Sequence, residues 1–331
     1  MKPTLLSTSA YLEGIRAGDK VLIGKAITLI ESSLEEHREA AADLLGACRP
    51  YAGGSLRLGI TGVPGVGKST FIEALGTYLI AEQNKKVGVL AIDPSSNRSG
   101  GSILGDKTRM EDLSMSNHAF VRPSPSSGSL GGVRETTHNT ITILEAAGFD
   151  VIMIETVGVG QSETMVHHMV DCFILLMLAG AGDSLQGIKR GIMEMADLLV
   201  INKADGDNLQ LAKNACREYQ MGMNLLPDSR DGWKRQIHYC SSTQKTRLDT
   251  IWSAVSSYVE HMKETGIFEQ NRADQAMSHF EEDWENTLKA EYGKMKGFAE
   301  LYARYQSKVQ SGELSSLRAA QMLFNDLQDR T

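Results

Sequence analysis

The segment at residues 62–70 reads GVPGVGKST and fits the pattern GxxxxGK[ST] at every position. An apolar run, LRLGIT at residues 56–61, precedes it, and an amphipathic stretch from Phe71 to Ala81 follows it. Glycines let the backbone curl so that successive amide N–H groups point at phosphate oxygens, and the start of the next helix adds positive potential. The pattern predicts a strand, a phosphate-binding loop and a helix. The expected phosphate-contacting residues are Gly62, Val63, Pro64, Gly65, Val66, Gly67, Lys68, Ser69 and Thr70.

Further apolar runs alternate with amphipathic stretches along the chain. They are KVGVLAID (86–93), HAFVRP (118–123), DVIMIET (150–156), CFILLML (172–178), DLLVIN (197–202) and QIHYCS (236–241). Unbroken apolar runs are typical of strands covered on both faces, as in a parallel sheet. Parallel strands need right-handed crossovers, which the amphipathic stretches supply as helices. The pattern predicts an α/β fold with a doubly wound, mostly parallel sheet of the P-loop NTPase type.

Three parts are expected along the chain: an N-terminal helical segment at residues 1–54, a nucleotide-binding domain at 55–265 and a helical arm at 266–331. In the arm, apolar residues recur every three or four positions, with a break near Gly293 and Gly297. This apolar seam packs either on its own domain or on a partner subunit, because so much aromatic surface needs cover. Its residues are Phe280, Trp284, Leu288, Tyr292, Met295, Phe298, Leu301, Tyr302, Tyr305 and Val309.

The apolar run DLLVIN leads into a second motif, NKAD, which ends at Asp205. The Asp205 carboxylate can accept hydrogen bonds from both N1–H and the 2-amino group of guanine, a donor pair that adenine lacks at that edge. A site whose buried acceptor the wrong base leaves unpaired discriminates by roughly 10⁴ or more. Asn202 is expected to hydrogen-bond the other side of the ring, and the Lys203 stem to cover its face. Ser241 and Ser242 end the next apolar run, where a guanine-binding backbone N–H is expected.

The run DVIMIET ends in Glu155-Thr-Val-Gly158, where P-loop GTPases usually carry DxxG. A carboxylate near Mg²⁺ and a glycine N–H near the γ-phosphate are expected there. Lys68 can reach the β- and γ-phosphates, and the Ser69 hydroxyl can ligate Mg²⁺.

Two aspartates are further candidates for the metal. Asp93 ends the run KVGVLAID, and Asp106 lies in a glycine-rich loop. Both could reach Mg²⁺ at the carboxyl ends of the sheet, where α/β ligands bind. Each is alternatively an aspartate that only forms a turn or caps a helix.

The water-orienting glutamine of Ras-like enzymes is missing from its usual place after Gly158. Val159 stands there, and Gln161 comes two residues later. We expect slow intrinsic hydrolysis, completed by a partner or a second subunit. The expected catalytic residues are Lys68, Asp93, Asp106, Glu155 and Gln161.

Charge and cysteine content exclude several classes of protein. The chain has 34 basic and 41 acidic residues and a net charge of −7, which argues against a nucleic-acid binder with a basic surface. The longest apolar stretch, Cys172 to Ala181, is about half of the ~20 residues that span a bilayer, so no membrane partner is expected. The first sixteen residues contain no basic segment followed by an apolar core, so a secretory signal is not expected there. Dispersed cysteines without CxxC are expected to be reduced, in a cytoplasmic protein.

The runs GVPGVGKST, IDPSS, GGSILGDKTRM, ETVGVGQSE, GDSLQGIK and NKAD together resemble the MeaB/ArgK/MMAA family of SIMIBI-class P-loop GTPases. The resemblance covers most of residues 10–331. It implies a GTPase chaperone that gates adenosylcobalamin loading into a cobalamin-dependent acyl-CoA mutase, above all methylmalonyl-CoA mutase, and protects that enzyme. It also implies GTP and Mg²⁺ as cofactors, and a homodimer formed through the C-terminal helical extension.

The resemblance also implies roles for individual residues. These are Lys68, Ser69 and Thr70 on phosphate and magnesium, Asp93, Asp106 and Glu155 around the metal, and Asn202, Lys203 and Asp205 on guanine. The segment at residues 180–189 corresponds to an additional switch loop. We hypothesise that Asp183, Gln186 and Lys189 couple the GTP state to the mutase; alternatively they are solvated loop residues. The loop after Ser241 departs from the family because it reads STQKT, without the usual alanine and glycines.

Three other functions stay open from the sequence. A nickel metallochaperone GTPase needs clustered His or Cys ligands, but only His167 and His168 are adjacent, in a predicted helix where neighbours point apart. A transport-protein kinase needs a phosphoacceptor site, which no motif supplies. A nucleotide-dependent interaction module with negligible turnover shares every binding motif and differs only in rate.

Overall fold

A computed structural model gives the fold of the chain. It describes residues 5–32, 34–92, 110–123, 130–156, 162–180, 190–223 and 232–328. Contacts divide the chain into two units, Met1–Gln275 and Ala276–Thr331, and each is described by itself.

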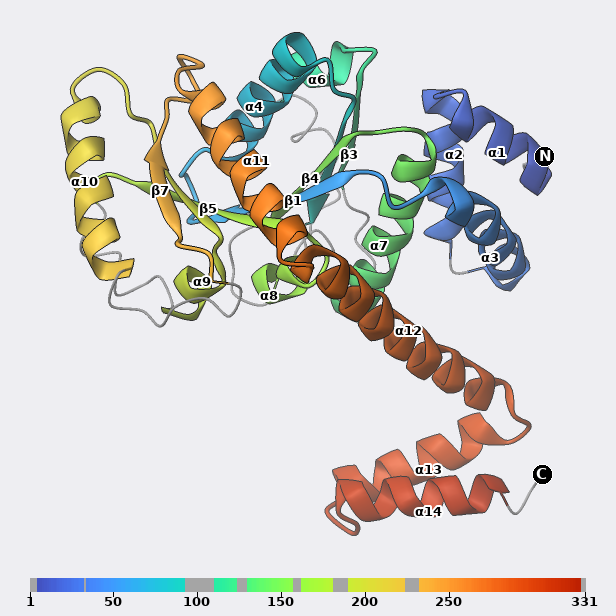
Figure 1. The fold of residues 1–331 in the computed structure, drawn as a ribbon. Helices are drawn as coiled ribbons and strands as arrows, with labels where there is room; N and C mark the ends of the chain where they lie inside the picture. Colours follow the sequence, from blue (N-terminus) through green and yellow to red (C-terminus); the bar gives the residue numbers. More distant parts are fainter. Residues whose placement is uncertain are drawn as a thin grey trace. The chain divides into compact units, whose positions relative to one another are not determined.

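A parallel sheet forms the centre of the first unit (Figure 1). Within the described residues its seven strands lie in the order β3-β2-β4-β1-β5-β6-β7, and every neighbouring pair is parallel. The strands are β1 (Leu56–Gly62), β2 (Val87–Ile92), β3 (Ala119–Pro123), β4 (Val151–Thr156), β5 (Cys172–Leu178), β6 (Leu198–Asn202) and β7 (Gln236–Tyr239). Each apolar run of the sequence becomes one strand, which confirms the α/β prediction.

Alternating side chains of β5 show how both faces of the sheet are covered. Cys172, Ile174 and Leu176 pack in the core beneath α4 (Lys68–Gln83), α6 (Glu111–Met115) and α11 (Leu248–Glu264). Phe173 points the other way, into the core beneath α7 (Leu130–Ala146) and α8 (Ser162–His167).

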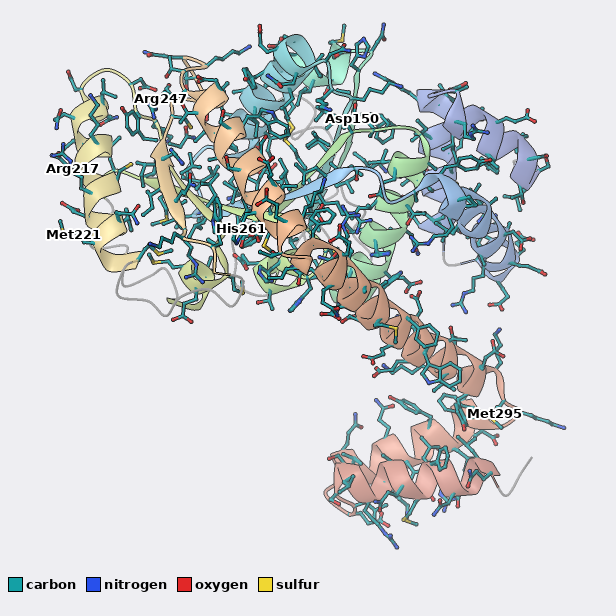
Figure 2. The ribbon with its side chains drawn as sticks, viewed as in Figure 1. Asp150, Arg217, Met221, Arg247, His261 and Met295 are labelled. Carbon is teal, nitrogen blue, oxygen red and sulfur yellow. The ribbon has the colours of Figure 1, made fainter. Side chains whose placement is uncertain are left out.

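The face of the sheet that carries Phe173 is covered beside β5 and β6 by two further helices, α9 (Arg190–Met195) and α10 (Asn208–Met223). Both helices pack with apolar residues of these strands. Arg217 and Met221 project from α10 away from the sheet (Figure 2). The helix is therefore amphipathic, with one side on the sheet and one in solvent.

The N-terminal segment folds as α1 (Thr8–Arg16), α2 (Lys20–Ile30), α3 (Glu35–Cys48) and a 3₁₀ turn (Arg49–Tyr51). Side chains cap the first two helices: Ser7 accepts from the Ala10 amide, and Asp19 accepts from the amides of the first turn of α2. Ile23, Ile27 and Leu44 share one apolar core with α7. These helices therefore belong to the first unit.

A buried ion network lies at the amino edge of the sheet. Glu145 of α7 accepts from the Arg57 guanidinium at 2.9 Å and from the Ser55 hydroxyl at 2.7 Å. Arg272 donates through Nε to Asp171 Oδ1 at 2.5 Å. Because Arg272 belongs to α12 (Ile267–Lys294), the network fixes the start of that helix to β1 and β5.

The second unit contains the rest of α12, then α13 (Phe298–Gln310) and α14 (Ser316–Gln328). Leu301 and Tyr305 of α13 pack against Ala319 and Leu327 of α14. Tyr305 also donates to Asp326 Oδ2 at 2.7 Å.

The predicted break in the apolar seam is confirmed, because α12 ends at Lys294 and α13 begins at Phe298, after Gly297 at φ 84°. The seam is divided by this break. Leu301 and Tyr305 of α13 are buried in the helical hairpin, whereas Tyr302 of the same helix is 51% exposed. Phe280 and Trp284 of α12 are 61% and 55% exposed.

The expectation that His167 and His168 point apart was wrong. Both residues lie at the C-terminal end of helix α8, which ends at His167, and their ring centroids lie 5.5 Å apart in an edge-on contact. His167 also packs edge-on against Phe173 at 5.6 Å. Burial, with a smaller contribution from the charge of His168, lowers the pKa of His167 from 6.5 to about 4.

Among the described residues, no helix is both long and apolar enough to cross a membrane.

His167 predicts a loss of stability in acid. Between pH 6.5 and 4 the unfolded chain binds this proton and the folded chain does not, so the free energy of unfolding falls as the pH drops through that window. The shift corresponds to a loss of about 3 kcal/mol. In urea titrations across this range, His167→Leu should flatten the pH dependence, whereas His118→Leu, at an exposed site, should leave the wild-type slope. An unchanged slope in His167→Leu would contradict the assignment.

Candidate functional site

The carboxyl ends of β1, β4 and β6 meet at one edge of the sheet, and the predicted site residues gather there. Gly62 ends β1 at φ 151°, and a Cβ at this position would lie 2.5 Å from the carbonyl oxygen of Leu176. Gly67, at φ 93°, would bring its Cβ to 3.0 Å from Asn202 Nδ2. Both positions therefore require glycine, and the curled loop between them leads into α4 at Lys68.

Lys68 bends back over the phosphate loop. Its Nζ donates to the carbonyl oxygen of Gly62 at 2.9 Å. Burial lowers the pKa of this ammonium, and the negative charges of Glu155 and Glu163 oppose the shift. The loop thus holds a cation where the β- and γ-phosphates are expected. Of the other loop residues, Val66 is buried and Thr70 is exposed.

Ser69 and Glu155 form the part of the site that suits a hard cation. The Ser69 hydroxyl lies 3.0 and 3.3 Å from the two carboxylate oxygens of Glu155, at the end of β4. A hydroxyl and a carboxylate are oxygen donors that Mg²⁺ accepts alongside waters and phosphates. No group of three or more His, Cys, Asp or Glu side chains that could hold a metal occurs in the part of the chain that the structure describes. The donors present therefore fit Mg²⁺ better than a softer metal.

Asn202 joins the two ends of the pocket. Its Nδ2 donates to the carbonyl oxygen of Val66 in the phosphate loop at 3.0 Å. Its Oδ1 accepts from the Ser242 amide at 3.2 Å and from the Ser242 hydroxyl at 2.7 Å. The side chain is 2% exposed, so these bonds are made out of water. Asn202 thereby holds the phosphate loop against the loop after β7.

Asp205 is oriented by the same loop. The Ser241 hydroxyl donates to Asp205 Oδ2 and accepts from the Gln244 amide at 3.1 Å. Lys203, at φ 60°, reaches back and donates to the carbonyl oxygen of Gly65 at 2.7 Å. The structure therefore brings the NKAD motif, the serine pair and the phosphate loop together, as the sequence predicted for a nucleotide pocket.

Arg247 supports this loop from outside. It lies just before α11 (Figure 2). Its guanidinium carbon lies 4.2 Å from the ring centroid of Tyr239, and its Nε donates to the Tyr239 carbonyl oxygen at 3.1 Å. Stacking and hydrogen bonding together hold the far end of the loop to the last strand.

Several predicted site residues lie outside the described part of the chain, and their roles stay predictions. They are Asp93, Asp106, Gly158, Gln161, Asp183, Gln186 and Lys189.

Sequence reasoning did not single out Glu163. This residue is 2% exposed, and its charge acts on Lys68. The sequence feature that could have pointed to it is its position at the end of the run ETVGVGQSE, eight residues after Glu155. Only the packing of α8 against the ends of the central strands shows that the carboxylate turns inward.

The model of the family described as methylmalonyl-CoA mutase-associated GTPase MeaB matches residues 23–295. The chain belongs to the MeaB family of P-loop GTPases. A probable GTPase of Mycobacterium tuberculosis is 45% identical over 321 residues, which cover 96% of this chain and 94% of that protein.

Other MeaB-family relatives are similar over nearly the whole chain. GTPase ArgK of Escherichia coli is 43% identical over 314 residues, or 95% of each protein. The mitochondrial methylmalonic aciduria type A homolog of Mus musculus is 40% identical over 334 residues, covering 96% of this chain and 79% of that one. A crystal structure titled LAO/AO transport system kinase superposes with a TM-score of 0.74 at 35% identity, over 98% of this chain and 100% of the other. These matches confirm the family and the fold predicted from the sequence.

The clamp made by Asn202 predicts a large stability difference between two neighbouring substitutions. Asn202→Ala leaves Val66 O and both Ser242 groups without their partner, so we expect the free energy of unfolding to fall by about 3 kcal/mol. Lys203→Ala removes one exposed contact and should cost less than about 1 kcal/mol. Urea denaturation of both variants measures this. Equal losses would show that Asn202 does not hold the two loops together.

Proposed function

We propose that this MeaB-family GTPase uses its nucleotide state to gate adenosylcobalamin loading into a cobalamin-dependent acyl-CoA mutase, most directly methylmalonyl-CoA mutase, and to protect that enzyme. The observation that carries the proposal is the joined pocket, in which Asn202 connects a phosphate loop to a guanine-type loop. The family description supports the client, since it names association with methylmalonyl-CoA mutase.

The phosphate end of the pocket suits GTP bound with Mg²⁺. Lys68 exchanges its bond to Gly62 for the β- and γ-phosphate oxygens, and the loop amides contact the same phosphates. Ser69 and Glu155 would hold Mg²⁺, which offsets phosphate charge when bound. Asp93 and Asp106 are proposed to complete the metal surroundings.

The base end suits guanine. Asp205, held by Ser241, accepts from N1–H and the 2-amino group, while Lys203 covers the ring and Asn202 lies at its other side. The preorganised carboxylate keeps its orientation without the base, which lowers the entropic cost of binding. The expected preference is GTP over ATP.

Coupling to the mutase is proposed to pass through the segment that carries Asp183, Gln186 and Lys189, between β5 and α9. A mutase that prefers the GTP-bound form must also change GTP affinity, because coupling between two sites is reciprocal. We further propose a homodimer formed through the arm, because Phe280 and Trp284 are exposed in the single chain and need apolar cover.

Asp205→Asn should change the base preference of the pocket from guanine to xanthine. Xanthine carries a carbonyl at C2, to which an asparagine amide can donate, and the guanine 2-amino group would lose its acceptor. We expect GTP affinity to fall about 100-fold or more and xanthosine triphosphate to bind more tightly than GTP. Calorimetry with each nucleotide and Mg²⁺ measures both constants. Asp207→Asn, the same change at an exposed site two residues along, should keep wild-type preference. Retained GTP preference in Asp205→Asn would contradict the base assignment.

The mutase proposal is tested with purified methylmalonyl-CoA mutase and the full chain. With a non-hydrolysable GTP analogue and Mg²⁺, the two proteins should co-elute, and the mutase should raise the slow intrinsic rate of GTP hydrolysis. ATP in place of GTP, and a mutase that uses no cobalamin, are the controls. If the mutase neither binds nor changes hydrolysis, the client is wrong, while the GTPase assignment stands on the nucleotide data.

A further inference from the structure

The buried carboxylate of Glu163 is not accounted for by the phosphate, metal or guanine contacts. The residue is 2% exposed, and its Oε2 has no hydrogen-bond partner among the described residues. Withdrawing a carboxylate from water costs free energy unless the group is paired or hydrogen-bonded. Buried polar atoms without a partner in native proteins are uncommon and point to a water, an ion or a ligand.

The position of Glu163 indicates which part of the nucleotide it faces. Helix α8 packs against β1 and β4, the strands that end at Gly62 and at Thr156, the residue after Glu155. The charge of Glu163 acts on the Lys68 ammonium, which bends over the phosphate loop. Because Lys68 is the group expected on the β- and γ-phosphates, Glu163 lies at the phosphate end of the pocket, away from the base.

We propose that Glu163 Oε2 accepts a hydrogen bond from the water that attacks the γ-phosphorus and orients it for hydrolysis. This inference rests on the proposed GTP hydrolysis. The water oxygen forms a bond to the γ-phosphorus, and the bond to the β–γ bridging oxygen breaks. GDP leaves with that electron pair, and the protons of the water end on inorganic phosphate and in solvent.

A general property of phosphoryl transfer and one feature of the sequence favour this role for Glu163. Phosphoryl transfer depends mostly on positioning and electrostatics, so an oriented water is what one side chain can contribute. The position directly after Gly158 is Val159, whose apolar side chain cannot orient water. Glu163 supplies an acceptor that this position lacks, in a place from which bulk water is largely excluded.

Two variants separate water orientation from simple charge balance with Lys68. Glu163→Gln keeps an acceptor oxygen and removes the charge, whereas Glu163→Ala removes both. In single-turnover hydrolysis by the full chain with Mg²⁺, we expect Glu163→Ala to be about 100-fold slower than wild type. We expect Glu163→Gln to lose clearly less. The Kd for a non-hydrolysable GTP analogue should be equal to or below the wild-type value in both, because a negative charge beside the phosphates has been removed.

Glu82→Gln is the matched control, since it removes the same charge from an exposed site on α4 and should keep the wild-type rate. The proposal is overturned if Glu163→Ala hydrolyses GTP within about threefold of wild type. It is also overturned if both variants slow equally and both bind the analogue more tightly, which is the result of charge balance alone. Should Glu163→Ala fail a thermal-melting check, Glu163→Leu, which also lacks an acceptor oxygen, replaces it, and hydrolysis within about threefold of wild type in that variant overturns the proposal. If the wild-type protein does not bind the analogue, the result instead contradicts the proposed function.

Discussion

Parallel pairing of β1 with β4 and β5 brings Gly62 and Glu155 to the same edge of the sheet, and pairing of β5 with β6 adds Asn202. Parallel strands all end at one edge, so residues distant in sequence become neighbours there. The sheet can be parallel only because helices cover both of its faces. The apolar runs that fill those faces are therefore the physical basis of the pocket at the edge.

Two carboxylates at this edge act on the Lys68 ammonium. Lys68 is partly withdrawn from water, which by itself disfavours its charged form, and the carboxylates of Glu155 and Glu163 restore part of that loss. A triphosphate would place more negative charge at the same point. In the proposed function, Glu155 and Glu163 would then share Lys68 with the nucleotide, and this would link nucleotide state to the helix that carries Glu163.

Much of the fold and part of the site could be predicted from local sequence. The phosphate loop, the strands and the break at Gly297 follow from residue type and spacing, because each reflects a local backbone requirement. Other features depend on distant partners. Glu163 turns inward because α8 packs on β1 and β4. The rings of His167 and His168 meet at the end of α8, where His167 also packs on Phe173 of β5. The arm at residues 266–331 was predicted to be helical, but the seam traced in the sequence ended at Val309. The apolar residues of α14 lie beyond it and meet their partners in α12 and α13 only in the folded chain.

The sequence by itself determined the order of strands and helices along the chain, the glycines of the phosphate loop and the carboxylate that we propose selects guanine. These are consequences of periodicity, backbone freedom and hydrogen-bonding chemistry, which act within a few residues. Only the tertiary structure decided that Asn202 clamps two loops, that Glu163 is buried with its charge acting on Lys68, and that the network around Glu145 holds the start of α12 to the sheet. Burial and pairing between segments far apart in the chain create those properties, and no local pattern contains them.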